Sequence, residues 1–344
     1  MKEHALDALV VSSLANIRYL TGFSGSNALA VVTAGKAFLI TDSRYALQSA
    51  EEVRGFRRII GRRGLLGDAA ARGALRGCRT AGFESDSLTY AQYRSLRKLF
   101  SGVRFKPAPG IVEALARIKD PQEVADIAEA AAISDRVFSG VLGLLRPGMT
   151  EREIASEISR LNVGLGSESD AFDIIVASGP RGALPHARPT DRRIRKGDFV
   201  LLDFGSTIRG YCSDMTRTLA VGNAPRRLRE AYRAVREANE SAVAAARGGM
   251  KARDLDAVAR GSIRRSGFGR YFVHSLGHGI GLRVHESPRV SPLSREVMES
   301  GNVITIEPGI YIPGSGGVRI EDDVLLGPGG CRILTKSPRE LIVL

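Results

Sequence analysis

The stretch LLDFGSTIRGYCSDMTRT, Leu201 to Thr218, carries two aspartates in a pattern typical of a β-hairpin. It predicts three consecutive segments, a buried strand, a turn and a returning strand of alternating character: residues 199–204, 205–210 and 211–221. Asp203 and Asp214 are therefore expected on neighbouring strands. Asp203 shares a strand face with Leu201, which favours an interior position. A buried carboxylate is costly unless it is paired or bound to a metal ion.

The same arrangement recurs in residues 302–326, NVITIEPGIYIPGSGGVRIEDDVLL. Two strands are expected around a Pro/Gly-rich turn, and one face of each carries a set of side chains: Val303, Thr305 and Glu307 on the first, Arg319, Glu321 and Asp323 on the second. Two such hairpins predict four converging carboxylates, whose mutual repulsion requires a cation. Any one of these acids alone would favour a solvated strand end or half of a salt bridge. Four in matching contexts favour a metal site.

Four of the five histidines lie in this part of the chain: His186 in ASGPRGALPHA, and His274, His278 and His285 in HSLGHGIGLRVHESP. A lone histidine is more often structural, but three within twelve residues of a glycine-rich segment favour a site. The segment has no H-E-x-x-H helix. A set of mostly carboxylate ligands with one imidazole suits divalent ions such as manganese or cobalt. It does not resemble a zinc site built from thiolates. Four acids are too many for one small ion, which favours two bridged ions about 3.5–4 Å apart.

Length and composition favour a soluble protein of two domains. The chain has 344 residues, 43% of them apolar, and no apolar run reaches the roughly 18 residues that span a bilayer. Glu3 and Asp7 stand where an export signal would be basic or apolar. Cys78, Cys212 and Cys331 are too few and too scattered for a disulfide framework. We therefore expect a reduced, cytoplasmic protein that does not associate with membranes.

The formal charge of +13 raises the question of a nucleic-acid partner. The charge is spread over most of the chain, and no recognisable nucleic-acid module accompanies it. A generally basic surface is the favoured interpretation, with no specific nucleic-acid partner and at most loose binding to polyanions at low salt.

Residues 1–112 are predicted to form a small α/β domain, because strand and helix patterns alternate before Pro107, Pro109 and Gly110 mark a boundary. The expected strands are short: residues 8–13, 28–33, 36–41, 56–61, 80–84 and 103–108. The expected helices are residues 46–54, 65–75 and 89–100.

Residues 113–344 are predicted to form a second, α+β domain. Asp120-Pro121-Gln122-Glu123 is a helix start with an acidic N-cap, and Thr150 with Glu153 opens another capped helix. Two further helices are expected at residues 226–247 and 252–266. Helices packed on antiparallel hairpins follow from this pattern.

Several motifs of the second domain resemble one known family of metallopeptidases. The motifs are DFG at Asp203, YCSDMTRT around Asp214, GHGIG around His278, VHE at His285, IEPGIY at Glu307 and GVRIED at Glu321. They are similar, in order and spacing, to the "pita-bread" M24 family of aminopeptidase P, prolidase and methionine aminopeptidase, from about Ile118 to the C-terminus. Residues 1–112 resemble the creatinase-like N-terminal domain of the aminopeptidase P and prolidase branch, as does the segment around His186.

The resemblance implies a role for each matching position. Asp203 would chelate one metal ion, Asp214 and Glu321 would bridge two, and His278 and Glu307 would complete the second site. Glu307 would also act as general acid and base. The catalytic set would be Glu307, His186 and His285, and the substrate-binding set would be His186, His274, His285 and Arg319. The two divalent ions are expected to be Mn²⁺, with Co²⁺ or Zn²⁺ as alternatives.

The leading functional hypothesis is a Xaa-Pro aminopeptidase, which releases the N-terminal residue from peptides with proline second. The alternative is a prolidase, which cleaves only Xaa-Pro dipeptides. A third hypothesis lies outside the enzymes: a basic, non-catalytic binding protein that reuses the fold. The resemblance further implies a homodimer acting on proline-containing peptides.

Overall fold

The chain forms two compact units in a computed structural model that describes residue 1 and residues 4–344. The units are Met1–Ala116 and Arg117–Leu344. The division predicted after residue 112 falls inside helix α5 (Ile111–Ala116). This helix belongs to the first unit because its Val112 packs in the same apolar core as Leu9.

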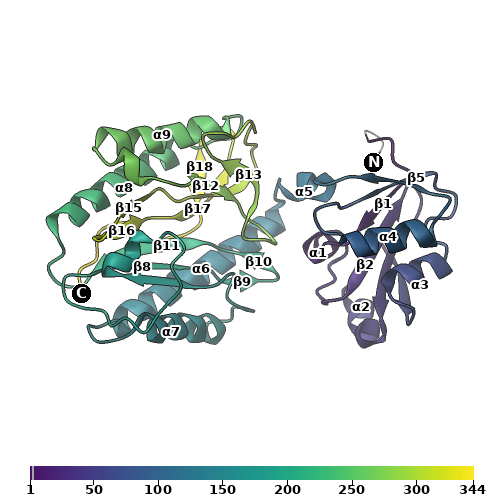
Figure 1. The fold of residues 1–344 in the computed structure, drawn as a ribbon, viewed down its shortest axis with the longest axis horizontal. Helices are drawn as coiled ribbons and strands as arrows, with labels where there is room; N and C mark the ends of the chain where they lie inside the picture. Colours follow the sequence, from purple (N-terminus) through teal and green to yellow (C-terminus); the bar gives the residue numbers. More distant parts are fainter. Residues whose placement is uncertain (2–3) are drawn as a thin grey trace. The chain divides into compact units, whose positions relative to one another are not determined.

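The first unit is built around a six-stranded sheet with strand order β4-β3-β2-β1-β5-β6 (Figure 1). Its strands are β1 (Ala8–Val11), β2 (Ala28–Thr33), β3 (Ala37–Asp42), β4 (Arg57–Gly61), β5 (Thr80–Phe83) and β6 (Arg104–Pro107). β2 runs antiparallel to β1 and β3, whereas β4, β5 and β6 pair with their neighbours in parallel. All six predicted strands are present, and the α/β class is confirmed.

Helices cover both faces of this sheet because alternate strand residues feed two cores, with Val10 in one and Leu9 in the other. Besides α5, the helices are α1 (Leu14–Thr21), α2 (Ala46–Glu52), α3 (Leu65–Ala71) and α4 (Tyr90–Leu99). The sequence predicted α2, α3 and α4 but missed α1 and α5. α1 is only eight residues long, too short for a clear helical repeat of apolar residues. Its stability therefore depends on the capping of its two ends. The Ser13 hydroxyl caps its first turn, and Gly22 ends it at φ 78°.

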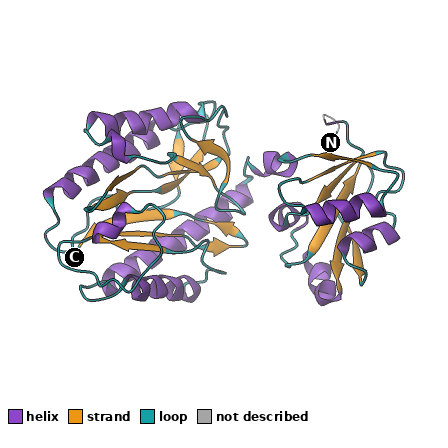
Figure 2. Ribbon diagram, viewed as in Figure 1, coloured by secondary structure: helices purple, strands orange, loops and turns teal. Residues whose placement is uncertain are grey.

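The second unit encloses its strands between two pairs of helices (Figure 2). The helices are α6 (Pro121–Leu144), α7 (Glu151–Gly164), α8 (Arg226–Ala245) and α9 (Ala252–Arg265). Asp120 and Thr150 cap α6 and α7 in complete capping boxes with Glu123 and Glu153, which confirms both predicted helix starts. None of the described helices is both long and apolar enough to cross a bilayer.

Each helix pair packs on its own sheet. α6 and α7 share a core with the three-stranded sheet β11-β8-β7, and α8 and α9 share one with the strands that carry the second acidic stretch. The strands of the first sheet are β7 (Ile175–Ser178), β8 (Phe199–Phe204) and β11 (Met215–Ala220). The second, five-stranded sheet has the order β13-β12-β14-β17-β18 and comprises β12 (Gly277–Gly279), β13 (Glu286–Val290), β14 (Val303–Ile306), β17 (Asp322–Leu326) and β18 (Cys331–Ile333).

The strands of both acidic hairpins are interrupted more often than predicted. β8 and β11 pair antiparallel as expected, but the residues between them form a separate two-stranded pair, β9 (Thr207–Ile208) with β10 (Tyr211–Cys212). In the second stretch, β15 (Gly309–Ile312) pairs with β16 (Gly316–Arg319), whereas β14 pairs with β17. The predicted return strand is therefore interrupted between Arg319 and Asp322, because its two halves join different sheets.

Candidate metal centre

The acids of the two hairpins meet in one cavity of about 1200 Å³ in the second unit. Asp203 lies on β8, Asp214 directly precedes β11, Glu307 directly follows β14, and Glu321 lies between β16 and β17. Three of the four acids thus occupy strand ends or breaks. Departure from regular strand geometry brings side chains from separate sheets to one point. The predicted convergence is present.

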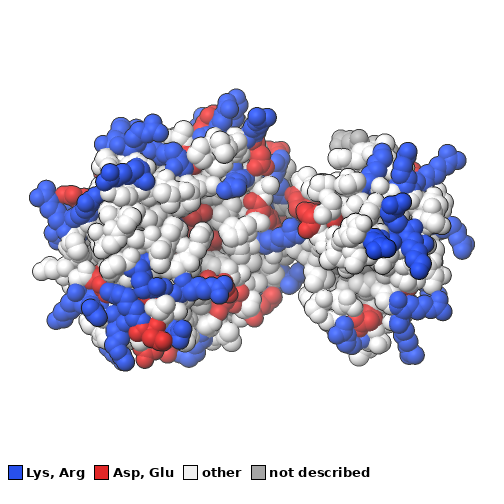
Figure 3. Space-filling model, viewed as in Figure 1, with Lys and Arg blue, Asp and Glu red and all other residues white. Residues whose placement is uncertain are grey.

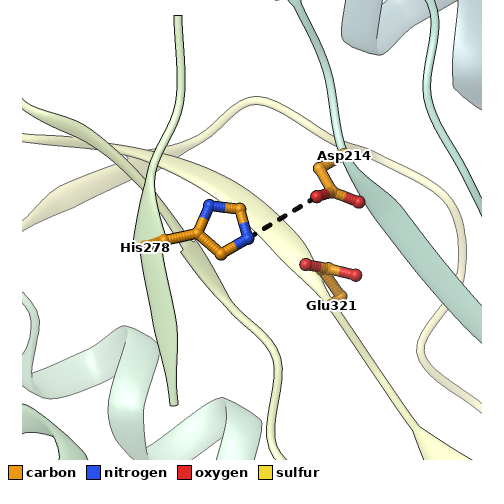
Figure 4. Close-up of side chains that lie close together, drawn as sticks. All are labelled: Asp214, His278 and Glu321. Atoms are coloured by element: carbon orange, nitrogen blue, oxygen red, sulfur yellow. Dashed lines mark ion pairs between the residues drawn. The ribbon is translucent and has the colours of Figure 1, made fainter. Parts of the chain in front are cut away.

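Asp214, His278 and Glu321 form the tightest group in this cavity. Each offers a ligand atom, and these atoms lie within 4.8 Å of one another. Figure 4 shows the two carboxylates and the imidazole ring pointing toward a common centre from three different segments. Carboxylate and imidazole ligands are the donor set that borderline divalent ions accept in proteins.

His278 presents a lone pair, not a proton, to this centre. Its Nδ1–H donates to the carbonyl oxygen of Gly279 at 3.0 Å, so Nε2 is the unprotonated nitrogen. Nε2 lies 3.7 Å from Asp214 Oδ2 and 3.4 Å from Glu307 Oε1. Burial, followed by the nearby His285, lowers the pKa of His278 to about 4, so the ring is neutral at pH 7. A lone pair facing two carboxylates fits a cation between them.

The buried carboxylates are poorly compensated by the protein. Burial, followed by the charge of Glu321, raises the pKa of both Asp214 and Glu307 well above their usual values. Burial, followed by Asp203, raises the pKa of Glu321 to about 8. Within the described residues, Oδ1 of Asp203 and Oδ1 of Asp214 are buried without a hydrogen-bond partner. Orphaned anionic oxygens of this kind fit metal coordination.

Arg319 is a buried cation that holds one side of the centre. Its guanidinium forms an ion pair with Asp203 and donates to Tyr311 Oη at 2.6 Å. Although burial opposes the charged form, Tyr311 and the neighbouring acids hold the pKa of Arg319 well above its usual value. Arg319 therefore orients Asp203. One guanidinium cannot neutralise four carboxylates, which leaves a charge deficit that divalent cations would fill.

Two residues that support the centre were given no role in the sequence prediction. Asp323 accepts a hydrogen bond from the backbone N–H of Asp214 at 2.9 Å. Thr216 donates from Oγ1 to Glu321 Oε2 at 2.6 Å and accepts from Arg319 Nε at 2.9 Å. The only signal in the sequence was the shared strand face of Asp323 and Glu321. These contacts fix the directions of the acids that would bind metal.

The remaining three predicted histidines also line the cavity. The rings of His285 and His278 lie edge to face, with centroids 4.4 Å apart. His186 lies on the loop that follows the 3₁₀ helix η3 (Gly179–Ala183). His274 Nδ1–H donates to the carbonyl of Ser275 at 2.7 Å, and its Nε2 accepts from Tyr311 Oη at 3.0 Å. Both nitrogens of His274 are therefore engaged inside the protein.

Close backbone packing fixes the loop that carries His186. A Cβ atom at Gly317 would lie 2.0 Å from the carbonyl oxygen of Gly182, so only glycine fits there. Arg319 also donates to the carbonyl of Pro185, the residue before His186, at 3.3 Å. The loop and the acid cluster are thus tied to the same strand.

Comparison with known proteins identifies the family of this chain. The profile of "Metallopeptidase family M24" matches residues 125–328, and the profile "Creatinase/Prolidase N-terminal domain" matches residues 1–118. The chain belongs to metallopeptidase family M24. M24 peptidases are dinuclear metal-dependent hydrolases, so the enzyme class and the need for metal predicted from the sequence are confirmed.

Three relatives of this M24 peptidase match nearly its whole length. The Xaa-Pro dipeptidase of Pyrococcus horikoshii is 39% identical over 347 residues, which covers 99% of this chain and 96% of that protein. The solved structure of a Xaa-Pro dipeptidase from Bacillus anthracis is 41% identical with a TM-score of 0.96, covering 100% of this chain and 96% of that one. A solved X-Pro aminopeptidase from Thermotoga maritima is 36% identical with a TM-score of 0.92, covering 98% of each chain. These similarities confirm the predicted two-part fold, with a creatinase-like first unit and a pita-bread second unit.

Proposed function

We propose that this M24 peptidase is a Xaa-Pro dipeptidase, the alternative hypothesis of the sequence analysis, and not primarily an aminopeptidase P. Full-length relatives at about 40% identity carry the dipeptidase name, including the Pyrococcus horikoshii protein and the Bacillus anthracis structure. The observation that carries the peptidase assignment is the cluster of buried, unpaired carboxylate oxygens around the neutral Nε2 of His278.

Five side chains would hold two divalent ions, for which Mn²⁺ is our first choice: Asp203, Asp214, His278, Glu307 and Glu321. When bound, such ions supply the Lewis acidity and the activated water of a two-metal hydrolase. Asp323, Thr216 and Arg319 hold these side chains in place through the hydrogen bonds described above.

Glu307 is the group that moves the proton. It would take a proton from the attacking water and deliver it to the departing proline nitrogen. Its Oε1 lies 3.4 Å from His278 Nε2, at the centre of the cluster. Burial, followed by the charge of Glu321, raises the pKa of Glu307 in the metal-free protein.

His285 and His186 are the donors for the carbonyl oxygen of the scissile bond. Burial, followed by the neighbouring His186, lowers the pKa of His285, so this ring is neutral at pH 7 and retains one N–H to donate. His274 is better suited to form the wall of the pocket than to donate to substrate, because both of its nitrogens already have partners.

A dipeptidase also needs a cation for the free carboxylate of proline, and two arginines at the cavity offer one. Arg289 and Arg188 line the cavity and are exposed. Arg188 lies 3.7 Å from Asp173, whereas the Arg289 guanidinium contacts only the Ser275 hydroxyl among the hydrogen bonds of the described residues. Arg289 is therefore our choice for the carboxylate contact.

Hydrolysis of matched substrates tests the proposal. The enzyme with Mn²⁺ should cleave Ala-Pro and act poorly on Ala-prolinamide and on Ala-Pro-Ala-Ala, which lack the carboxylate at proline. The Arg289→Met variant should raise KM for Ala-Pro by about tenfold or more. Arg295→Met, an exposed arginine outside the cavity lining, is the matched control.

The second candidate is the X-Pro aminopeptidase activity of the Thermotoga maritima relative. A cavity of about 1200 Å³ exceeds the space that a dipeptide needs, which favours longer substrates. Cleavage of Ala-Pro-Ala-Ala with a kcat/KM equal to that for Ala-Pro would reject the dipeptidase proposal in favour of this one.

A further inference from the structure

A second hollow, of about 670 Å³, lies in the first unit, far in sequence from the acid cluster. It is bounded by the turn between β2 and β3, by the outermost strand β4, and by the segment that follows α3. Its lining includes five basic residues and no acidic one: Lys36, Arg57, Arg58, Arg72 and Arg76. We call this hollow the basic groove.

The cations of the basic groove are exposed and uncompensated. Within the described part of the chain, none of the five forms an ion pair with a carboxylate. Exposed arginines elsewhere, such as Arg44 and Arg209, do form such pairs. Arg58 donates to the backbone carbonyl of Ala46 at 3.3 Å, so its guanidinium already has a hydrogen-bond partner at the start of α2. Lys36, Arg57, Arg72 and Arg76 make no such bond among the described contacts, and they come from three separate segments.

The turn at Gly73 shapes one wall of the groove. Gly73 has φ 63°, a conformation that favours glycine, and the Arg76 side chain lies against it, with Nε 3.4 Å from where a Cβ would stand. Arg72 immediately precedes this glycine. The turn therefore brings two arginines to the mouth of the same hollow.

The first unit carries more net positive charge than the second, although it is the shorter of the two. Residues 1–116 contain 17 Lys and Arg against 9 Asp and Glu, a net charge of +8. Residues 117–344 contain 33 against 28, a net charge of +5, and the two values give the +13 of the chain. Figure 3 shows Lys and Arg side chains over much of the visible surface of the first unit. The smaller unit thus carries most of the excess positive charge.

We propose that the basic groove binds a small polyphosphorylated anion. Arginine guanidinium groups pair bidentately with phosphate oxygens, and several cations around one hollow suit a chain of phosphates better than a single carboxylate. The volume lies within the range of small-molecule sites. Charges on an outer strand also prevent edge-to-edge pairing, but that purpose needs only the arginines of β4 and not Lys36, Arg72 and Arg76.

Binding is tested on the full-length, metal-loaded protein by fluorescence anisotropy. The probe is a fluorescent ATP analogue, saturated with Mg²⁺ and held far below the protein concentration, so that it cannot strip metal from the second unit. We expect saturable binding at about 0.15 M salt. Unlabelled tripolyphosphate should displace the probe, and adenosine should not.

Matched double variants locate the site. Arg57→Gln with Arg72→Gln should weaken binding by about tenfold or more. Arg104→Gln with Lys106→Gln removes the same charge from β6, at the opposite edge of the sheet, and should change binding less than about twofold. Lys36→Gln with Arg76→Gln repeats the test from the other segments, in case the first variant does not fold.

Three outcomes would overturn the proposal. The first is no binding below about 1 mM protein at this salt concentration. The second is equal weakening by the β4 and β6 double variants, which would assign binding to overall charge. The third is displacement by adenosine alone. None of these tests depends on the peptidase assignment.

Discussion

The carboxylate of Asp323 accepts a hydrogen bond from the backbone N–H of Asp214 at 2.9 Å, across 109 residues of sequence. Both side chains are buried, and Asp214 belongs to the group that would bind metal. The bond fixes the backbone from which the Asp214 carboxylate projects. Asp323 is therefore a positioning residue for the centre.

Replacement of Asp323 by alanine should weaken metal binding by about 10–100-fold, because the Asp214 backbone loses its anchor. Manganese affinity is measured by calorimetric titration of the chelator-treated protein. Asp323→Asn retains an acceptor oxygen and serves as the control, with a smaller loss. Equal affinity for the alanine variant and the unmodified protein would show that Asp214 needs no such support.

Loss of Arg319 should destabilise the metal-free protein strongly. The Arg319→Met variant leaves the buried carboxylate of Asp203 without its cation, which costs about 3–5 kcal/mol. Arg289→Met, at an exposed arginine of the same cavity, should change stability by less than about 0.5 kcal/mol. Urea unfolding of the chelator-treated variants measures both, and similar losses for the two would contradict the role of Arg319.

Stability of the metal-free protein should fall as pH rises from about 7.5 to 8.5. The pKa of Glu321 is raised from 4.5 to about 8, and the pKa values of Asp214 and Glu307 are raised as well. In this window the folded state binds more protons at Glu321 than the unfolded chain does, so the free energy of unfolding decreases by up to about 1.4 kcal/mol per pH unit for this group.

Histidines act in the opposite direction but only at lower pH. The pKa of His278 is lowered from 6.5 to about 4 and that of His274 to about 3, so their contribution rises with pH and is complete about one unit above the unfolded value of 6.5. Urea midpoints at about pH 7.5 and 8.5 therefore isolate the carboxylates. Metal-loaded protein, whose acids are ionised throughout, should show no such decline. A rise in stability of the metal-free protein over this window would contradict the assignment.

Chelation should abolish hydrolysis of Ala-Pro, and added Mn²⁺ should restore it. Metal should also raise the free energy of unfolding, by about 2.7 kcal/mol at a metal concentration 100 times the dissociation constant. The urea midpoint should rise accordingly. The Asp214→Asn variant, which loses a carboxylate that would bridge the ions, is the control and should recover neither activity nor stability. Full activity after exhaustive chelation, or a purified protein without bound metal, would instead favour the non-catalytic binding protein.

Local chemistry explains why so much of the fold could be predicted. The capping boxes of Asp120 and Thr150 fix helix starts within four residues, and the apolar run of residues 199–204 placed β8 without error. Helix α1 was missed because its stability comes from the Ser13 cap and the Gly22 end more than from an apolar stripe. The second hairpin was predicted as one continuous pair of strands. In the structure it is divided near Glu321, because its two halves pair in different sheets. No local sequence pattern encodes such a division.

The sequence by itself determined which side chains gather and of what kind they are, because acids and histidines in buried, regularly spaced strands have few physical alternatives to a metal site. Tertiary structure alone decided how they are held. Arg319 pairs with Asp203 across 116 residues, and Asp323 reaches Asp214 only after two sheets have packed together. Such contacts depend on the breaks between strands and on the packing of separate sheets. These are long-range properties of the folded chain, whereas residue type and spacing are local.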